Sequence, residues 1–331
     1  MTKGACSTIE KIGKVLTIDR VKELADPTFF YHILHGTRQV PDVRELLRGA
    51  IDVHIHAYPD AVQRSQSMLE VATDAAQLEF QAVVFKDHFT MTSGEAWLVE
   101  RFVEKLCEAG LLKGKIKVFG GLVLNDEVGG LNPHAVEAAL KYPNTKFIWM
   151  PSFSAAHHKR KFKQPGGISI LSKDGGVVPE MEQILDMIMK AKGVCVSTSH
   201  LSAEEIFVLL EECRKRNIKT LVDHPLQEAY KLTIDEMQRC AKLGTYIGIY
   251  NMGSLPSVYV PVCDPYEMIT VVKQVGAEHC VLASDLGQIL LPTPIEGYIQ
   301  LVRILLALGI EPNEIKLMAR DNAEKLLSLS S

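Results

Sequence analysis

The sequence predicts an α/β protein folded as a (β/α)8 TIM barrel. From residue 50 onward, short runs of β-branched and apolar residues alternate with amphipathic segments of helical length. Polar residues, Gly or Pro separate these segments, a rhythm that is typical of βα units and a parallel sheet. The repeat of roughly 33 residues suits a closed barrel of eight such units. We therefore expect a barrel at residues 50–331, preceded by a mostly helical N-terminal extension at residues 1–49.

The expected strands are short apolar runs, as is usual for parallel strands that are buried on both faces. They are Ala50–Ile55, Ala82–Lys86, Lys117–Leu124, Lys146–Met150, Gly193–Ser199, Thr220–Asp223, Tyr246–Tyr250 and Cys280–Ser284. The expected helices have amphipathic spacing, and several begin at a capping residue or at Pro. They are Ser67–Phe80, Gly94–Ala109, Pro133–Tyr142, Pro179–Lys192, Ala203–Arg216, Ile234–Leu243, Pro265–Val275 and Pro294–Leu308.

Three segments fall outside the eight units. The extension at 1–49 either packs under the barrel or contacts a second subunit, and the final helix is expected at Pro312–Leu329. The third segment is the long connection Pro151–Val178 after strand four, which contains HHKRKFK and then a predicted hairpin turning at Ser172–Gly175. An insertion after a barrel strand lies over the catalytic mouth, so we interpret this one as a lid.

Composition excludes several classes of function. The formal net charge of −4 provides no basic field for nucleic acid or an anionic membrane. No apolar stretch is long enough to span a bilayer, and the N-terminus lacks the apolar core of a secretory signal. The seven cysteines are scattered without a CxxC pair, which argues against disulfides and favours a cytoplasmic location.

Chemistry-bearing side chains follow four of the expected strands. Strand one ends with His54 and His56, strand five with His200, strand six with His224 and strand eight with Asp285. Alternate residues of a strand face the same way, and all strand ends of a barrel meet at one mouth. A lone His at a strand end is usually structural, but this set together predicts a metal site.

Neutral imidazole and carboxylate suit a divalent metal, with zinc favoured and manganese or iron as alternatives. A bound metal lowers the pKa of water toward about 7 and supplies a nucleophile at neutral pH. Asp285 is positioned to act as a catalytic general base as well as a ligand. We expect one or two ions.

The pattern resembles the amidohydrolase superfamily over residues 50 to about 329. That family has HxH after strand one, single His residues after strands five and six, and Asp after strand eight. The closing helix MARDNAEKLLSL is also similar. The resemblance implies metal-assisted hydrolysis of amide, lactone or related bonds, often in small rings. A minority of members catalyse decarboxylation, hydration or isomerisation instead.

One departure concerns the residue that bridges two metals. Many two-metal members carry a carboxylated Lys or a Glu after strand four, but here strand four ends in Ile-Trp-Met. Lys86 follows strand two and shares a strand face with His88. Three roles are open for Lys86: a carboxylated bridge between two metals, a cation that binds an anionic substrate group, or an interior Lys paired with Asp87 or Asp285.

Further residues are candidates for reading a small-molecule substrate at the barrel mouth, namely Tyr58, Arg64, His88, Arg160 and Asn251. Arg160 lies in the basic HHKRKFK run, which is either a solvated loop or a clamp for a carboxylate or phosphate. The expected activity is hydrolysis of an amide, imide or lactone bond in a small, cyclic, anionic substrate. A single-metal decarboxylase or lyase is the alternative, and homo-oligomerisation is left open.

Overall fold

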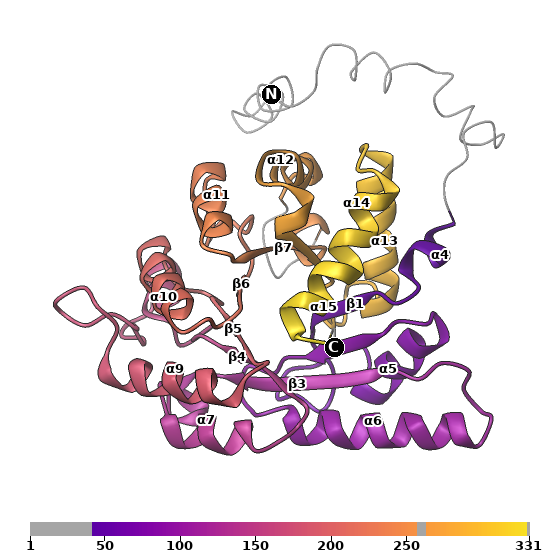
Figure 1. Ribbon diagram of the computed structural model, residues 1–331, viewed down its shortest axis with the longest axis horizontal. Helices are drawn as coiled ribbons and strands as arrows, with labels where there is room; N and C mark the ends of the chain where they lie inside the picture. Colours follow the sequence, from indigo (N-terminus) through magenta and orange to yellow (C-terminus); the bar gives the residue numbers. More distant parts are fainter. Residues whose placement is uncertain (1–41, 257–262, 330–331) are drawn as a thin grey trace, which may run out of the picture.

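The computed structural model describes residues 42–256 and 263–329 (Figure 1). Most of the expected N-terminal extension, residues 1–41, lies outside this described part. Its last residues form the short helix α4 (Val43–Leu47), which Asp42 caps by accepting a hydrogen bond from the Arg44 backbone nitrogen.

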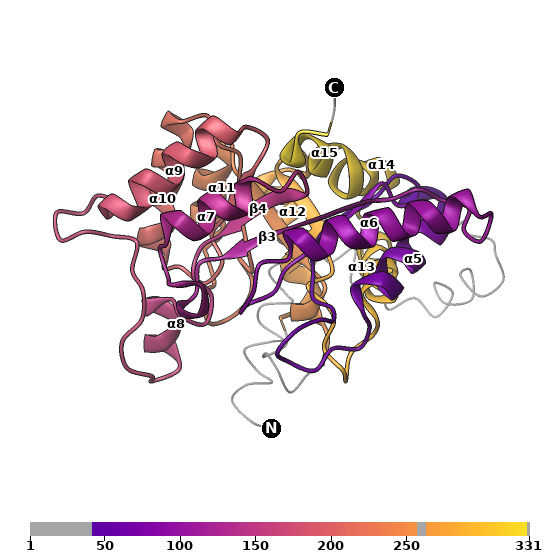
Figure 2. The ribbon, with the colours of Figure 1, turned by 90° about the horizontal axis from the view of Figure 1, so that it is seen from below.

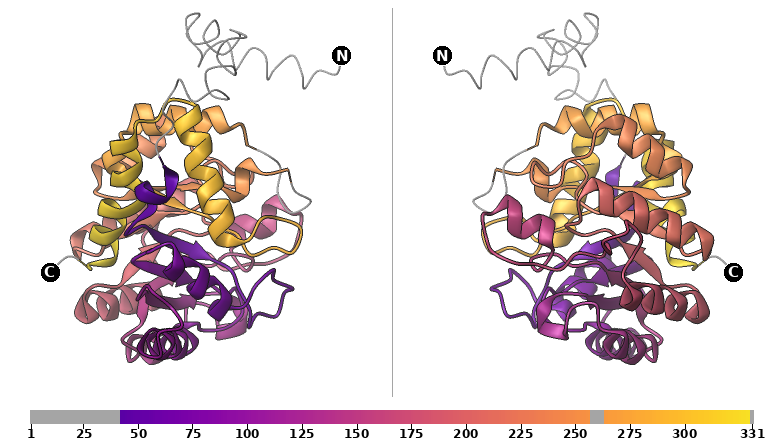
Figure 3. Two further views of the ribbon diagram at one scale, coloured as in Figure 1. Left: turned by 90° about the vertical axis from the view of Figure 1, so that its right-hand side faces the viewer. Right: turned by 90° about the vertical axis from the view of Figure 1, so that its left-hand side faces the viewer.

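Eight parallel strands form one sheet in the order of the sequence, which confirms the predicted barrel. Figure 3 shows the helices arranged around these strands. The strands are β1 (Ile51–Ile55), β2 (Ala82–Phe85), β3 (Lys117–Val123), β4 (Thr145–Trp149), β5 (Cys195–Ser197), β6 (Thr220–Val222), β7 (Tyr246–Tyr250) and β8 (Cys280–Ala283).

Backbone hydrogen bonds between the first and the last strand close the barrel. The Asp285 nitrogen donates to the His54 oxygen at 2.9 Å, and the His56 nitrogen donates to the Leu286 oxygen at 2.8 Å. The Asp52 carboxylate supports this seam because it accepts from the Ser284 nitrogen at 3.1 Å. Three of these residues belong to the predicted metal site, so barrel closure and site assembly share the same stretch of backbone.

The predicted helices are confirmed, with ends that shift by a few residues. They are α5 (Met68–Gln77), α6 (Ser93–Glu108), α7 (Pro133–Leu140), α9 (Pro179–Ala191), α10 (Ala203–Lys215), α11 (Ile234–Lys242), α12 (Pro265–Val275) and α13 (Pro294–Ala307). Capping boxes at Ser67, Ser202 and Thr233 explain why α5, α10 and α11 begin where they do. The expected final helix consists of α14 (Pro312–Lys316), a π-helical turn (Leu317–Asp321) and α15 (Asn322–Leu327).

Apolar side chains of the strands and of α15 fill the interior of the barrel. Phe147 and Trp149 stack at a ring distance of 5.0 Å inside it, and Leu326 and Leu327 of α15 join the same cluster. The barrel is therefore a packed core rather than a pore, and its polar residues collect at the carboxyl ends of the strands. Among the described residues, no helix is both long and apolar enough to cross a bilayer.

The insertion after β4 contains the helix α8 (Ala156–Lys161) and the predicted hairpin. An antiparallel bridge joins Leu171 to Val177, and the Ser172 nitrogen donates to the Gly176 oxygen at 2.8 Å, as expected for that hairpin. The prediction of a loop for HHKRKFK is wrong for most of the run, because the run is helical as far as Lys161 and forms most of α8. Figure 2 shows α8 on the same side of the barrel as the connections after β1 and β8.

Candidate metal centre

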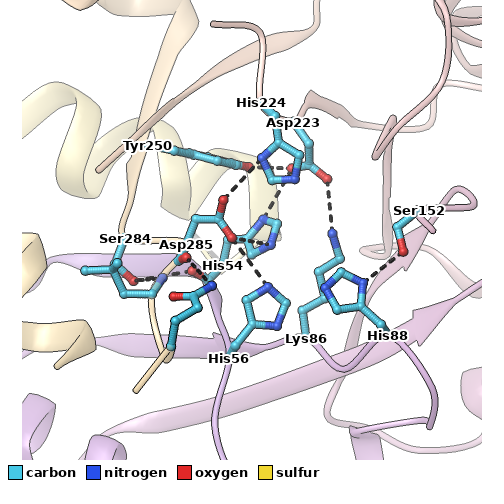
Figure 4. Close-up of polar contacts among 12 residues, drawn as sticks. His54, His56, Lys86, His88, Ser152, Asp223, His224, Tyr250, Ser284 and Asp285 are labelled. Carbon is cyan, nitrogen blue, oxygen red and sulfur yellow. Dashed lines mark hydrogen bonds and ion pairs between the residues drawn. The ribbon is translucent and has the colours of Figure 1, made fainter. Parts of the chain in front are cut away.

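Three of the five predicted ligands surround a fourth, the Asp285 carboxylate, at the barrel mouth (Figure 4). Asp285 Oδ1 lies 3.4 Å from His54 Nε2 and 3.4 Å from His56 Nε2. Asp285 Oδ2 lies 3.3 Å from His224 Nδ1. One ligand atom each of His54, His224 and Asp285 fits within 4.8 Å of the others. The fifth predicted ligand, His200, lies beside His224 with the ring centres 5.3 Å apart.

Three residues that follow strands have left-handed backbone conformations. The φ angles are 44° at Ser199, 52° at His224 and 54° at Asp285. A residue other than Gly avoids this region, at a cost of about 1–2 kcal/mol, because its Cβ approaches the following carbonyl oxygen. Such conformations gather at functional sites, where the surrounding structure enforces them. Here they turn His224 and Asp285 toward the cluster.

The buried nitrogens of the cluster fit a cation. Within the described part of the chain, both ring nitrogens of His54 and Nδ1 of His224 are buried without a hydrogen-bond partner. Burial lowers the pKa of His224 to about 4 and holds the pKa of His56 and of His200 well below the ordinary value. These imidazoles are therefore neutral at pH 7, which is the form that binds metal.

Lys86 pairs with Asp223, not with either partner considered from the sequence. Its Nζ lies 3.9 Å from Asp223 Oδ2 and makes no hydrogen bond to any described residue. Asp87 instead accepts from two backbone nitrogens of its own turn. Burial would raise the pKa of Asp223, but the charges of Lys86 and His54 outweigh it and hold that pKa well below the usual range. Burial lowers the pKa of Lys86.

Asp223 also orients His54. Its Oδ1 lies 3.4 Å from His54 Nδ1 and accepts a hydrogen bond from the Tyr250 hydroxyl. A carboxylate on one ring nitrogen fixes the tautomer of a metal-binding His and leaves the other nitrogen for the metal. This arrangement directs His54 Nε2 toward Asp285. Sequence patterns did not predict this role for Asp223 or Tyr250, although Asp223 directly precedes the predicted ligand His224.

Arg64 contacts the other His of the HxH pair. Arg64 Nη2 lies 3.3 Å from His56 Nδ1, and Arg64 Nε donates to Asp60 Oδ2 at 2.7 Å. A guanidinium only donates, so His56 accepts at Nδ1 and its hydrogen lies on Nε2, facing Asp285. Binding of a metal by His56 Nε2 therefore requires this contact to rearrange, whereas His54 needs no such change.

His88 joins the site through a polar chain on its β4 side. His88 Nδ1 lies 2.8 Å from Ser152 Oγ, which accepts from Asn125 Nδ2 at 2.8 Å. The His88 ring stacks on His56 at 4.8 Å and on Phe153 at 4.2 Å. The predicted strand-two residue thus lines the site, and half-exposed Phe153 covers it from the solvent side.

The remaining substrate-binding candidates lie apart from the cluster. Tyr58 is 38% exposed on the connection after β1, and Arg160 is exposed on α8. Asn251 is fully buried, donating to the Gly297 oxygen and accepting from Ser254 Oγ, both at 2.7 Å. In the described ranges, none of these three side chains makes a polar contact with the metal-site residues.

Two residues that the sequence analysis does not select lie against His200. His158 Nδ1 is 3.1 Å from His200 Nδ1, and the Tyr230 ring stacks on His200 at 4.2 Å. The HHKRKFK run drew attention for its positive charge rather than for its histidines, and no periodic pattern marks the connection after β6 that carries Tyr230.

Comparison with known proteins supports the fold. A family model described as "Family of unknown function (DUF6282)" matches residues 49–248. No curated protein sequence matches the chain. Among solved structures, an amidohydrolase from Pseudomonas aeruginosa is 14% identical with a TM-score of 0.58, over 86% of this chain and 98% of that chain.

Two further solved structures are similar at the same level. A dipeptidase described as a metallo peptidase of family M19 is 11% identical with a TM-score of 0.57, over 85% of this chain and 98% of that one. An organophosphorus hydrolase from Deinococcus radiodurans is 15% identical with a TM-score of 0.55, over 86% and 93%. The expected resemblance to the amidohydrolase superfamily is confirmed for the barrel architecture.

Proposed function

We propose that this chain, which belongs to the DUF6282 family of unknown function, is a metal-dependent hydrolase. The observation that carries the proposal is the buried cluster of His54, His224 and Asp285 with its unpartnered imidazole nitrogens. His56 and His200 complete the proposed ligand set, and zinc is the favoured ion, with manganese or iron as alternatives. The similar solved structures include proteins named as hydrolases, which supports the class.

A divalent cation held by this cluster would supply Lewis acidity and would lower the pKa of a water molecule beside it. Asp285 takes the proton of the attacking water and passes it to the leaving nitrogen or oxygen as the carbonyl–heteroatom bond breaks. Gln227 Nε2 lies 3.5 Å from Asp285 Oδ2, and Gln288 Nε2 donates to the backbone oxygen of Asp285 at 3.3 Å. Burial of the whole cluster excludes bulk water and strengthens each electrostatic contact.

The proposed substrate is a small amide, imide or lactone, cyclic and anionic. Lys86 and Arg64 are buried beside the cluster, where they pair with Asp223 and Asp60, and we propose that one of them also binds a negative group of the substrate. The insertion that carries α8 contacts the cluster through His158 and limits the space above it, which favours a small molecule. One of the similar structures is named after a lactonase template, consistent with this bond class.

Carboxylation of Lys86 is a separate proposal within this function. Its buried, unbonded Nζ lies beside the cluster at the end of β2, where a carbamate would add two oxygen ligands. A metal-to-protein ratio near two in the presence of bicarbonate, falling to one in Lys86→Ala, is the expected result. A ratio of one that is unchanged in Lys86→Ala rules out the bridge and leaves two roles for Lys86, a substrate-binding cation or an interior partner of Asp223.

A single-metal decarboxylase or lyase is the second candidate. The described residues hold one compact ligand group, and Trp149, which ends β4, and Met150, which follows it, offer no ligand that a hard divalent metal prefers. Release of carbon dioxide from aromatic or heterocyclic acids, without hydrolysis of amides or lactones, would favour this reaction.

The deciding experiment for the proposed class is metal uptake combined with a substrate panel. We expect His54→Ala and Asp285→Asn to lose bound zinc and to lose hydrolysis of dihydropyrimidines, hydantoins or lactones. His134→Ala, an exposed substitution on α7, is the control and should retain both. Zinc binding that is indifferent to His54 and Asp285 would overturn the assignment.

We also propose a cytoplasmic location, and we leave open whether the chain forms a homo-oligomer. All six cysteines in the described ranges are free, and five of them are buried, which is consistent with the proposed cytoplasmic location. Light scattering of the purified full-length chain would decide between a monomer and a homo-oligomer.

A further inference from the structure

His158 belongs to the insertion after β4, yet its side chain reaches the metal-site residues. It is 9% exposed, while Arg160 and Lys161 on the same helix are exposed. His158 Nδ1 lies 3.1 Å from His200 Nδ1 and 2.5 Å from the Tyr230 hydroxyl. The three rings are nearly parallel, with interplanar angles of 17° to 19°.

Further contacts hold α8 in this position. The Ala156 nitrogen donates to the Ile168 oxygen, and the Ile168 nitrogen donates to the Ser154 oxygen, each at 2.7 Å. His157 Nε2 lies 3.0 Å from the Ala229 oxygen; a carbonyl only accepts, so His157 donates. Neighbouring histidines of α8 therefore tie the insertion both to His200 and to the connection after β6.

The tautomers of His158 and His200 decide how these contacts are made. Two Nδ1 atoms 3.1 Å apart form a hydrogen bond only when one carries a hydrogen and the other a lone pair. A tyrosine hydroxyl can donate or accept, and a neutral imidazole nitrogen has one lone pair, so Tyr230 and His200 share that lone pair when His158 accepts at Nδ1. In this arrangement His200 carries its hydrogen on Nδ1, and His200 Nε2 is left with a lone pair for a cation.

We propose that His158 is a positioning residue that fixes the metal-binding tautomer of His200 and couples docking of the α8 insertion to cation binding. The proposal rests on the proposed function, because His200 is one of its ligands. Since binding and docking are linked, a cation that engages His200 stabilises docked α8, and docked α8 strengthens cation binding by the same factor. A neighbour that orients a metal-binding His typically contributes about 10–100-fold in metal affinity.

The first test compares His158→Phe, which keeps a stacking ring without an acceptor, with His158→Asn, whose Oδ1 replaces the Nδ1 acceptor. Nitrogen-15 NMR of the metal-free protein should show His200 as the Nδ1–H tautomer in the wild type and in His158→Asn, with that preference lost in His158→Phe. Zinc affinity, measured by competition with a chromophoric chelator, should fall about 10-fold or more in His158→Phe and recover in His158→Asn. His134→Phe is the matched control on the exposed surface.

The second test uses the insertion itself as the reporter. Exposed Arg160, Lys161 and Lys163 are trypsin sites that become accessible when α8 undocks. Zinc should slow cleavage at residues 159–163 in the wild type and in His158→Asn, but not in His158→Phe. Intact mass spectrometry follows the cut, and circular dichroism confirms that each variant is folded.

The outcomes separate the two proposals. If His54→Ala abolishes zinc uptake while His158→Phe leaves zinc affinity, the His200 tautomer and the cleavage rate unchanged, the role of His158 is wrong and the hydrolase assignment stands. If zinc uptake is indifferent to His54, the proposed function fails, and the tautomer in metal-free protein alone decides the contact between His158 and His200. If His158→Phe does not fold, wild-type tautomer data and His158→Asn decide the same question.

Discussion

Ser199 has a left-handed backbone like His224 and Asp285, but its side chain makes no hydrogen bond to the described residues of the site. Its Oγ is buried without a hydrogen-bond partner among the described residues, and its φ is 44°. His224 and Asp285 have the same backbone conformation and place side chains in the cluster. The conformation of Ser199 instead serves the next residue, His200, whose direction it sets.

We predict that Ser199→Gly stabilises the protein. Gly occupies the left-handed region without strain but loses more freedom on folding, so the net gain in unfolding free energy is about 1 kcal/mol. Urea denaturation measures it. Ser199→Ala removes the hydroxyl and keeps the strained backbone, so it should gain less; equal gains would assign the effect to the hydroxyl alone.

We predict that the two histidines of the HxH pair differ in metal binding. His54→Gln should abolish zinc uptake, because Asp223 already orients His54 for it. His56→Gln should weaken zinc binding less, because Arg64 occupies the His56 Nδ1 lone pair. Equilibrium dialysis measures both. Equal losses would show that Arg64 leaves His56 when the metal binds.

At the scale of elements, a buried carboxylate joins α6 to the sheet. Glu100 on α6 accepts from the Val118 nitrogen of β3 at 2.9 Å and from Asn144 Nδ2, just before β4, at 3.0 Å. Lys117 Nζ adds a contact at 3.0 Å. This single side chain ties one helix to β3 and to the residue before β4, and Asn144 Nδ2 also donates to the Val118 oxygen at 2.7 Å.

We predict that Glu100→Ala lowers the unfolding free energy by about 2 kcal/mol, because the buried Val118 nitrogen loses its acceptor while Asn144 Nδ2 keeps the Val118 oxygen. Glu104→Ala, one turn further along α6, removes a more exposed ion pair with Arg101 and should cost less than about 1 kcal/mol. Chemical denaturation of both variants makes the comparison. Similar losses would mean that the buried contacts are replaced by water.

The sequence predicted the elements well because strand runs and capped helices are local patterns. It also predicted that His54, His56, His224 and Asp285 gather at one mouth, since a barrel brings its strand ends together whatever the loops do. It did not predict the pairing of Lys86 with Asp223 or the contact of His158 with His200. The contact between Lys86 and Asp223 depends on which buried groups lie closest in space, and the contact between His158 and His200 depends on where the insertion folds back. Neither property appears as a periodic pattern in the sequence.

At the scale of the whole molecule, a cation in this cluster would connect four strands, β1, β6, β8 and, through His200, β5. A ligand that binds only the folded state stabilises it by about 2.7 kcal/mol at a hundred times its dissociation constant. We predict that zinc raises the melting temperature by on the order of 5 °C and that a chelator reverses the shift. Differential scanning calorimetry measures it, and His54→Gln should show no shift.

The contact between Asp52 and Ser284 spans 232 positions of the chain. A ribosome must therefore translate most of the polypeptide before the hydrogen bond between Ser284 and Asp52 can form. Until β8 arrives, β1 and β7 present unpaired borders, and the carboxylate at 285 is missing from the nascent pocket. Chains that end before β8 thus combine two defects, unpaired strand edges that can aggregate and an incomplete ion-binding pocket.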